Sequence, residues 1–314
     1  MSLPGPLVCI VGPTASGKSL VAEGVATRLG SSVVSVDAMQ VYRGMDVGTA
    51  KTPVSERRRP LLMVDVADIT EDYSVRLFQR DARRRVDDLL ASAVTPVLCG
   101  GTGLYLDAVI DEMEFPAGAI GDGSRTRYED FAAEHGADAL HDLLADRDPA
   151  SAALIHPNNV RRCVRALEML DEGVSYAEHH EGLHERRPHY DATIWGLTMD
   201  RARLYARIDE RVNRMVEAGL VDEVRSLLGR GLESSKTASQ AIGYKEVASA
   251  LRGEASLEEA IDEVKLRTRR YAKRQLSWFR RDGRVRWIDL DAVSPDEAVE
   301  TIVSALLVRG DARG

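Results

Sequence analysis

The sequence predicts a protein of the α/β class, in which a parallel sheet is flanked by helices and a helical segment is inserted. Short apolar runs rich in β-branched residues alternate with segments whose apolar residues recur at helical spacing. Such alternation is typical of a parallel sheet with helices on both faces. After about residue 112 only helices are expected, and no strand is expected before residue 192. We therefore expect an α/β core of residues 1–112 and 192–314 and a helical insertion domain of residues 113–191.

The elements of this core can be placed along the chain. Residues 7–11 are a continuous apolar run that stops at Gly12, as a buried parallel strand does. Residues 19–29 carry apolar side chains on one helical face and are followed by Gly30, a common helix terminator. In chain order we expect strands over 7–11, 33–36, 61–64, 97–99, 192–199 and 285–290, helices over 19–29, 73–91, 201–228 and 295–308, and a Gly- and Pro-rich loop over 115–123.

The composition excludes several classes of protein. A chain of 314 residues with 44% hydrophobic and 29% charged residues is neither disordered nor a disulfide-stapled miniprotein. Its three cysteines lie in apolar surroundings and form no Cys-x-x-Cys pair, which indicates buried thiols in a reducing compartment. The first apolar run is too short for a signal peptide or a membrane span, so we expect a cytoplasmic protein without a membrane partner.

One motif has a well-defined chemistry. Residues 12–19 match Gly-x4-Gly-Lys-[Ser/Thr], the P-loop, and stand directly between the first strand and the first helix. Its glycines let backbone N–H groups surround a phosphate, and the helix that follows directs its positive end at the same anion. Lys18 can reach the outer phosphate oxygens, and the Ser19 hydroxyl can coordinate Mg²⁺. The predicted fold is therefore P-loop NTPase-like, with a phosphate or diphosphate bound by Gly12, Pro13, Thr14, Ala15, Ser16, Gly17, Lys18 and Ser19.

Acidic and hydroxyl side chains are expected at the same edge of the sheet. Asp37 follows the strand over 33–36, and ligands of such sheets bind at the carboxyl ends of the strands. Its carboxylate could accept a proton from a nucleophile, or could be the N-cap of a helix formed by the residues after it. Thr102 could reach the reacting centre or cap a helix. Asp65 could hold Mg²⁺ or cap a turn.

The charge of the chain is unevenly distributed. The formal net charge of −8 argues against a nucleic-acid partner for the chain taken as a whole. Residues 265–286, however, hold ten basic residues against one acidic residue, a local net charge of +9. Tyr271, Gln275, Trp278 and Phe279 lie between these cations, which suits RNA binding, while a solvated helix face is the alternative. A second basic patch is expected at residues 161–165, whereas residues 111–148 carry a net charge of −8.

Together these motifs resemble those of the tRNA dimethylallyltransferases, which prenylate the adenosine on the 3′ side of the anticodon. The resemblance extends over about residues 7–290 and departs from the family at Ala38, where serine is more frequent. The segments that carry it are Gly12–Ser19, Asp37–Tyr42 with Gly44–Lys51, Gly100–Tyr105, His156–Asn158 with Arg161–Glu168, Ala241–Glu246, and Arg270–Gln275 with Trp278–Arg280.

The resemblance implies a reaction and a set of site residues. The P-loop would hold the diphosphate of dimethylallyl diphosphate with Mg²⁺, through Thr14, Lys18 and Ser19. Asp37 would be the general base, and Arg211, or else Arg207, would neutralise the leaving group. The protein would act as a monomer on the anticodon stem-loop of tRNAs that read codons beginning with U. The residues that would bind this tRNA are Asp37, Ala38, Met39, Gln40, Thr102, Arg125, Arg161, Arg162, Arg165, Gly243, Tyr244 and Lys245.

Three other functions fit part of the pattern. An adenylate dimethylallyltransferase would act on a free nucleotide and would not need the basic segment 265–286. A P-loop kinase for a small molecule would need arginines in a lid, which the sequence does not show. A non-catalytic RNA-binding protein would need neither Asp37 nor Lys18.

Overall fold

The chain folds into two compact units. The computed structural model describes residues 4–115, 123–179 and 186–311. One unit comprises residues 1–110 and 188–314, and the other comprises residues 111–187. The domain boundaries expected from the sequence were 112 and 192. Most of the loop expected over 115–123 lies outside the described residues.

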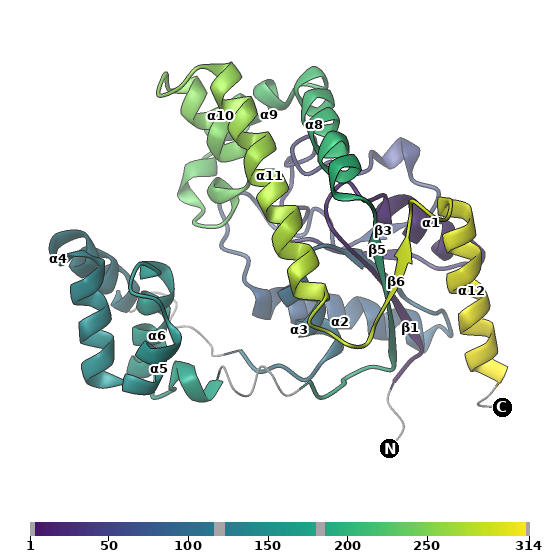
Figure 1. The fold of residues 1–314 in the computed structure, drawn as a ribbon, viewed down its shortest axis with the longest axis horizontal. Helices are drawn as coiled ribbons and strands as arrows, with labels where there is room; N and C mark the ends of the chain where they lie inside the picture. Colours follow the sequence, from purple (N-terminus) through teal and green to yellow (C-terminus); the bar gives the residue numbers. More distant parts are fainter. Residues whose placement is uncertain (1–3, 116–122, 180–185, 312–314) are drawn as a thin grey trace. The chain divides into compact units, whose positions relative to one another are not determined.

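A six-stranded parallel sheet forms the centre of the larger unit (Figure 1). The strand order is β3-β2-β4-β1-β5-β6, so that β1 lies between β4 and β5. Because neighbouring strands are parallel, their carboxyl ends meet at one edge, and the P-loop leaves β1 at that edge. The α/β class and the parallel sheet predicted from the sequence are confirmed. The strands are β1 (Leu7–Val11), β2 (Val33–Val36), β3 (Leu61–Leu62), β4 (Val97–Gly100), β5 (Ala192–Thr198) and β6 (Val285–Asp289).

Helices cover both faces of this sheet. Leu7, Cys9 and Val11 of β1 face one hydrophobic core, together with side chains of α2 (Val75–Ala91) and α3 (Gly103–Ile110). Val8 and Ile10 face the other core, which α1 (Lys18–Arg28) and α12 (Pro295–Asp311) cover. This alternation follows from the two-residue period of a strand. It explains why β1 reads as a continuous apolar run rather than as an alternating one.

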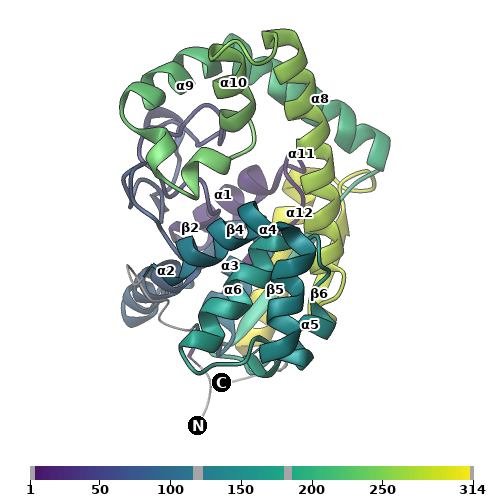
Figure 2. The same ribbon diagram turned by 90° about the vertical axis from the view of Figure 1, so that its left-hand side faces the viewer.

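Four further helices form a group that follows the carboxyl end of β5 (Figures 1 and 2). They are α8 (Arg201–Glu217), α9 (Leu220–Gly229), α10 (Tyr244–Leu251) and α11 (Leu257–Phe279). The helices expected over 201–228 are present as α8 and α9, and Gly219, which adopts φ +97°, separates them. A left-handed residue of this kind ends one helix and lets the chain turn before the next.

The third predicted strand is shorter than expected. The sequence predicted residues 61–64, but β3 spans only Leu61–Leu62. Met63 and Asp65 have φ values of +60° and +58°, which are incompatible with extended backbone. The chain therefore turns away from the sheet immediately after β3.

The smaller unit is helical, as predicted for the insertion. Its described helices are α4 (Ser124–Arg147), α5 (Pro149–Leu154) and α6 (Val160–Asp171). Tyr128, Leu140 and Leu167 belong to a hydrophobic core of its own. The Asp171 carboxylate accepts hydrogen bonds from Arg127, Arg147 and Tyr128, which joins the two ends of α4 to the end of α6.

The sequence also gave expectations about the cysteines and about membrane-spanning segments. All three cysteines are buried and form no disulfide, as the sequence predicted. Within the described ranges, no helix combines the length and the apolar character that a membrane span requires.

Substitution of Gly100 tests the close approach of two strands. A Cβ atom at Gly100 would lie 1.9 Å from the backbone carbonyl oxygen of Val36 on the neighbouring strand. Gly100→Ala should therefore force β2 and β4 apart and lower the free energy of unfolding by about 3 kcal/mol or more. Gly229→Ala is the matched control, because a Cβ there would meet no atom within 4 Å. Urea unfolding measures both variants, and equal stability of the two would contradict this packing.

Candidate functional site

The P-loop, residues 12–19, connects β1 to α1 and has the geometry of an anion-binding loop. Gly17 caps α1 with φ +97°, and a Cβ at Gly12 would lie 2.7 Å from a backbone oxygen of Leu197, so both positions require glycine. The Ser16 hydroxyl is buried and has no hydrogen-bond partner among the described residues. A buried polar group without a partner is costly, and an anion in the loop would supply one.

Lys18 begins α1 and belongs to this anion site. Its ammonium group donates a hydrogen bond to the carbonyl oxygen of Pro13, at 3.0 Å. Burial lowers the pKa of Lys18, and the positive charge of Arg211 lowers it further, whereas Cys99 and Asp37 oppose this effect. A bound polyanion would favour the charged ammonium, so the site is built to gain electrostatic energy from a phosphate or diphosphate.

The side-chain amide of Gln275 holds the P-loop against the next loop of the sheet. Its Oε1 accepts a hydrogen bond from the Thr14 N–H at 2.8 Å, and its Nε2 donates to the Gly101 carbonyl oxygen at 3.0 Å. The residue is 5% exposed, and a Cβ at Gly101 would lie 2.0 Å from its Nε2. The sequence assigned Gln275 to an RNA-binding surface, and this assignment is wrong, because the side chain is internal.

Asp37 and Thr102 lie together at the carboxyl ends of β2 and β4. Asp37 Oδ1 accepts the N–H groups of Met39 and Gln40, at 2.8 and 3.3 Å, so the carboxylate caps a turn rather than the helix that one alternative predicted. Thr102 Oγ1 accepts the Ala38 N–H at 3.3 Å. Both side chains also line a cavity, described next. The capping role and a role toward a ligand are therefore compatible.

This central cavity has a volume of about 400 Å³ and lies between the sheet edge and helices α8–α11. Thr14, Asp37 and Thr102 line it from the loops of the sheet. Tyr271 lines it from α11, where burial raises the pKa of its hydroxyl to about 12. Val212 is one of the apolar residues that line it from α8 and α9. The cavity thus offers both polar groups and apolar surface to a ligand.

A second cavity, the P-loop cavity, has a volume of about 530 Å³ and is lined by Lys18, Ser19, Arg207, Arg211 and Arg214, among others. Arg207 Nε donates to the Ala15 carbonyl oxygen at 2.8 Å, whereas an Arg211 amino group donates to the Thr49 carbonyl oxygen at 3.3 Å. Burial lowers the pKa of Arg211, and Asp37 opposes this effect.

Arg211 lines the central cavity as well as the P-loop cavity. Arg207 lines only the P-loop cavity. The sequence left the choice between these two arginines open. The structure places both beside the P-loop, and it places Arg211 at the junction with Asp37. Arg214, which also lines the P-loop cavity, was missed because nothing in its local sequence distinguishes it from other surface arginines on α8.

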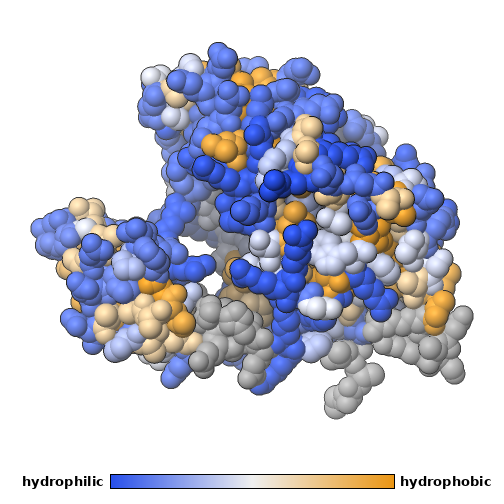
Figure 3. Space-filling view, in the orientation of Figure 1, coloured by the Kyte–Doolittle hydropathy of each residue, from blue (hydrophilic) through white to orange (hydrophobic). Residues whose placement is uncertain are grey.

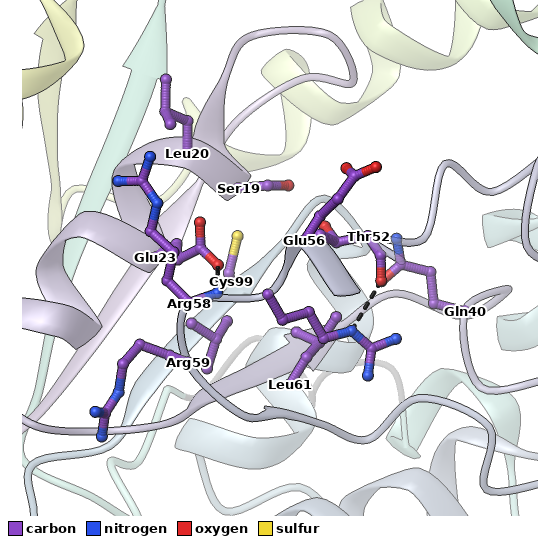
Figure 4. Close-up of a pocket in the computed structure, with 12 residues that line it drawn as sticks. Ser19, Leu20, Glu23, Gln40, Thr52, Glu56, Arg58, Arg59, Leu61 and Cys99 are labelled. Carbon is purple, nitrogen blue, oxygen red and sulfur yellow. Dashed lines mark hydrogen bonds between the residues drawn. The ribbon is translucent and has the colours of Figure 1, made fainter. Parts of the chain in front are cut away.

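A third cavity, of about 280 Å³, borders the P-loop at Ser19 (Figure 4). Figure 4 shows the Ser19 hydroxyl directed into this space, with Thr52 and Glu56 across from it and Gln40 farther along the same side. Hydroxyl, amide and carboxylate oxygens are ligands that Mg²⁺ prefers. Burial raises the pKa of the Cys99 thiol in the same wall to about 11, so it stays neutral and is a poor ligand.

The oxygen donors near Ser19 fit a Mg²⁺ ion, but only one that phosphate oxygens also hold. In the part of the chain that the structure describes, no three His, Cys, Asp or Glu side chains gather into a ready-made metal site. Mg²⁺ is commonly bound by few protein groups together with substrate phosphates. The donor set therefore favours a metal that accompanies a phosphorylated ligand.

A half-buried carboxylate shapes the segment that follows Asp37. Glu223 of α9 accepts the backbone N–H groups of Asp46, Val47 and Gly48, at 3.0, 2.7 and 3.1 Å. It also accepts the Tyr244 hydroxyl at 2.6 Å. The Tyr244 ring lies under Gly48, where a Cβ would approach it to 2.5 Å. Glu223 was missed by the sequence analysis, since its three backbone partners are 175 or more residues away.

A buried lysine fixes the far end of the same segment. Lys51 donates to the Tyr42 carbonyl oxygen at 3.0 Å and forms ion pairs with Asp46 and Asp65, at 2.6 and 2.7 Å. Asp65 lines none of the three cavities. The alternative in which Asp65 holds Mg²⁺ is therefore wrong, because its carboxylate is paired with Lys51 away from the P-loop.

The other residues assigned to tRNA fall into two groups. Ala38, Met39, Gly243 and Tyr244 line the central cavity, Gln40 lines the third cavity, and Lys245 is exposed and donates to Gln240. Arg125, Arg161, Arg162 and Arg165 belong to the helical unit, on α4 and α6. Arg125 forms an ion pair with Glu129 at 3.0 Å, and Arg165 lies 3.6 Å from Glu168. Their role toward tRNA stays a prediction.

The basic segment 265–286 is partly neutralised. Arg267 pairs with Glu263 and Glu246, and Arg269 pairs with Asp209, so acids outside the segment supply partners that the local sequence did not show. Lys265 and Arg284 also have acidic partners, in Asp262 and Asp282. In the described structure, no carboxylate pairs with Arg270, Lys273, Arg274, Arg280, Arg281 or Arg286. Hydrophilic residues cover most of the path of α11 in Figure 3.

The fold and the site together define a P-loop protein of the α/β class in which the anion-binding loop adjoins a mixed polar and apolar cavity. The model of the IPP transferase family matches residues 40–282, and that of the isopentenyl transferases matches residues 6–60. The first match covers more than half of the sequence. The chain belongs to the IPP transferase family.

Curated relatives and solved structures agree with this membership. The tRNA dimethylallyltransferase of Desulforudis audaxviator is 44% identical over 98% of this chain and 99% of its own length, and that of Streptomyces coelicolor is 46% identical over 91% of each. The tRNA isopentenylpyrophosphate transferase of Bacillus halodurans superposes with a TM-score of 0.71 at 43% identity, covering 96% of this chain and 95% of that one. A eukaryotic dimethylallyltransferase described as acting on tRNA gives a TM-score of 0.77 at 26% identity, covering 93% of this chain and 77% of that one.

Substitution of Gln275 tests the link between α11 and the P-loop. Gln275→Ala leaves the Thr14 N–H and the Gly101 carbonyl without their internal partner, so the P-loop should lose its fixed geometry. Affinity for inorganic pyrophosphate, measured by calorimetry, should fall about tenfold, as expected when a buried hydrogen bond is lost. Gln275→Glu keeps an acceptor for Thr14 but places a carboxylate oxygen against the Gly101 carbonyl oxygen and a negative charge beside the anion site, so affinity should fall at least as far. Ser277→Ala on the exposed side of α11 is the control, and a drop as large as that of Gln275→Ala would contradict the assignment.

Proposed function

We propose that the chain transfers a dimethylallyl group from dimethylallyl diphosphate to the exocyclic amine of the adenosine on the 3′ side of the anticodon, in tRNAs that read codons beginning with U. The names of its relatives support the reaction class. The observation that carries the proposal is the position of Arg211, which lines both the P-loop cavity and the central cavity. A diphosphate in the P-loop and a nucleophile beside Asp37 would meet at this residue.

The residues present suit each part of the reaction. The adenosine amine attacks the first carbon of the dimethylallyl group, the bond from this carbon to the diphosphate oxygen breaks, and the bonding electrons leave with the diphosphate. Lys18 and Arg211 stabilise the negative charge that develops on the leaving group. The amine proton passes to Asp37, whose carboxylate is held in place by the two N–H groups on Oδ1.

The surroundings of the reacting carbon favour transfer over hydrolysis. An allylic carbon gains cationic character as the diphosphate leaves, and water would capture it. Val212 and Tyr271 help to line the central cavity with carbon-rich surface, which limits the room for water. Mg²⁺, held by Ser19 and the diphosphate oxygens, would supply further positive charge against the leaving group.

The tRNA would bind along α11, one of whose unpaired cations lines the central cavity. Arg274 lines this cavity, and its guanidinium lies 5.6 Å from the centre of the Tyr271 ring. Arg270 and Lys273 are exposed on the same helix. These cations can bind RNA phosphates, while an adenosine from the flexible anticodon loop is flipped into the cavity. We expect the protein to act as a cytoplasmic monomer.

A transfer assay tests the reaction and its acceptor. Purified protein with Mg²⁺ and labelled dimethylallyl diphosphate should modify tRNAs that read codons beginning with U, and the label should be found on the adenosine next to the anticodon. AMP offered in parallel should stay unlabelled. Label on AMP but not on tRNA would assign the chain to the adenylate dimethylallyltransferases, and consumption of ATP with a small-molecule acceptor would indicate a kinase.

Substitution of Asp37 tests the proton acceptor. Asp37→Asn keeps an oxygen for the Met39 and Gln40 N–H groups but cannot take up the proton. We expect kcat to fall by about 10²- to 10⁴-fold with tRNA affinity retained, as for loss of a general base. Asp222→Asn, at an exposed position on α9, is the control. Unchanged turnover in Asp37→Asn would show that another group accepts the proton.

A further inference from the structure

We propose that Met215 and Leu220 form the end wall of the donor's hydrocarbon site and restrict the donor to a five-carbon chain. The proposal rests on the function proposed above, because it concerns which prenyl diphosphates the site accepts. It gives a role to the apolar end of the central cavity, which the reaction itself does not use.

One face of α8 changes from charged to apolar along its length. Arg207, Arg211 and Met215 are spaced by four residues each, so their side chains follow one another on the same face, about 6 Å apart along the helix axis. Arg207 lines the P-loop cavity, Arg211 lines both cavities, and Met215 lines only the central cavity. The order of cation, cation and thioether matches a molecule with a diphosphate head and a hydrocarbon tail.

The groups suited to the nucleophile come from other elements. Asp37 and Thr102 reach the central cavity from the loops after β2 and β4, and Thr268 and Tyr271 reach it from α11. A tail that continues from Arg211 along α8 therefore runs toward Met215 and away from the sheet loops. This separates the hydrocarbon from the polar groups that would receive the adenosine.

The apolar end of the cavity is closed by tightly packed side chains. Leu220 begins α9 and is 1% exposed, and Val264 of α11 is 3% exposed. Both line the central cavity beside Met215 and Val212. A Cβ on Gly243 would lie 4.0 Å from Leu220, so the chain before α10, which also lines the cavity, packs beside this wall. A longer tail could not pass without displacing these residues.

The size of the cavity leads to the same conclusion. Its volume of about 400 Å³ is near the lower end of the range for ligand pockets, which is about 300 to 1,000 Å³. The base of an adenosine and a five-carbon chain must occupy it together during transfer. A second isoprene unit would need space that Met215 and Leu220 fill.

Competition between two donors tests the proposal. Wild-type protein, tRNA and Mg²⁺ are supplied with dimethylallyl diphosphate and with geranyl diphosphate, which has ten carbons, and kcat/KM is measured for each. The wild type should strongly favour the shorter donor. Met215→Ala should raise the ratio of geranyl to dimethylallyl kcat/KM by about tenfold or more, the scale of a change in pocket size. Met215→Val and Leu220→Val should shift the ratio in the same direction by less.

The ratio of geranyl to dimethylallyl kcat/KM separates a change in donor specificity from a general loss of active protein. Each variant is compared with itself on two donors, so a general loss of folded protein does not change the result. Val216→Ala is the matched control, because Val216 neighbours Met215 in the chain but does not line the cavity, and its ratio should equal that of the wild type. An unchanged ratio in both Met215 variants, or a wild type that uses both donors equally, would overturn the proposal. A wild type that transfers neither donor would contradict the proposed function instead.

Discussion

The geometry of the site depends on the hydrogen bonds of one side-chain amide. The loops after β1 and β4 leave neighbouring strands at the same edge of the sheet, and in the described part of the chain no backbone hydrogen bond joins these two loops. Gln275 replaces that missing pairing, since it accepts from Thr14 and donates to Gly101. Because its partner in the P-loop is 261 residues away in the sequence, the anion site is completed only when α11 has docked. Formation of the P-loop geometry is therefore coupled to the folding of the C-terminal part of the chain.

A second constraint acts on the segment between Asp37 and β3. Most of this segment lacks helix or strand, so its backbone polar groups need other partners. Glu223 accepts three consecutive N–H groups, and Lys51 binds a carbonyl and two carboxylates. Lys51 is buried and has two carboxylate partners, and Glu223 is half-buried and has backbone and hydroxyl donors, so neither side chain is left without partners. The position of Asp37 is thus set by residues far from it in the sequence.

The sequence predicted those features whose causes are local. The P-loop, β1 and α1 follow from a glycine pattern and from apolar spacing within a short stretch, and the structure has these elements there. Helices were predicted over 201–228 without a position for the break between α8 and α9, because the local sequence alone does not fix φ +97° at Gly219. The inward orientation of Gln275 was missed for a related reason. A glutamine within a run of cations is expected to lie on a polar surface. Only the folded structure shows that Gln275 has two internal partners, Thr14 and Gly101.

The charge pattern illustrates the same limit. Counting residues within 265–286 gave ten cations and one acid, but Arg267 and Arg269 find their partners on α10 and α8. The cations that stay unpaired are fewer and lie at particular positions on α11. Cations near the P-loop are of a different kind, because burial lowers the pKa of Lys18 and of Arg211. The exposed cations of α11 are suited to a polyanion that stays in water, whereas Lys18 and Arg211 are suited to an anion that is removed from water.

The manner in which the helical unit is inserted has a consequence for how such proteins can diverge. The chain leaves the sheet unit at Ile110 and returns to it at His189, whose N–H donates to the Ile110 carbonyl oxygen at 2.8 Å. Glu112 and Arg187 are joined in the same way at 2.7 Å. These hydrogen bonds hold the two ends of the insertion together. Residues can therefore be added to or removed from the insertion at a small cost in loop-closure entropy and without shifting the register of β5. The helical unit is therefore an insertion whose length and sequence can change while the strands and loops of the sheet edge are left untouched.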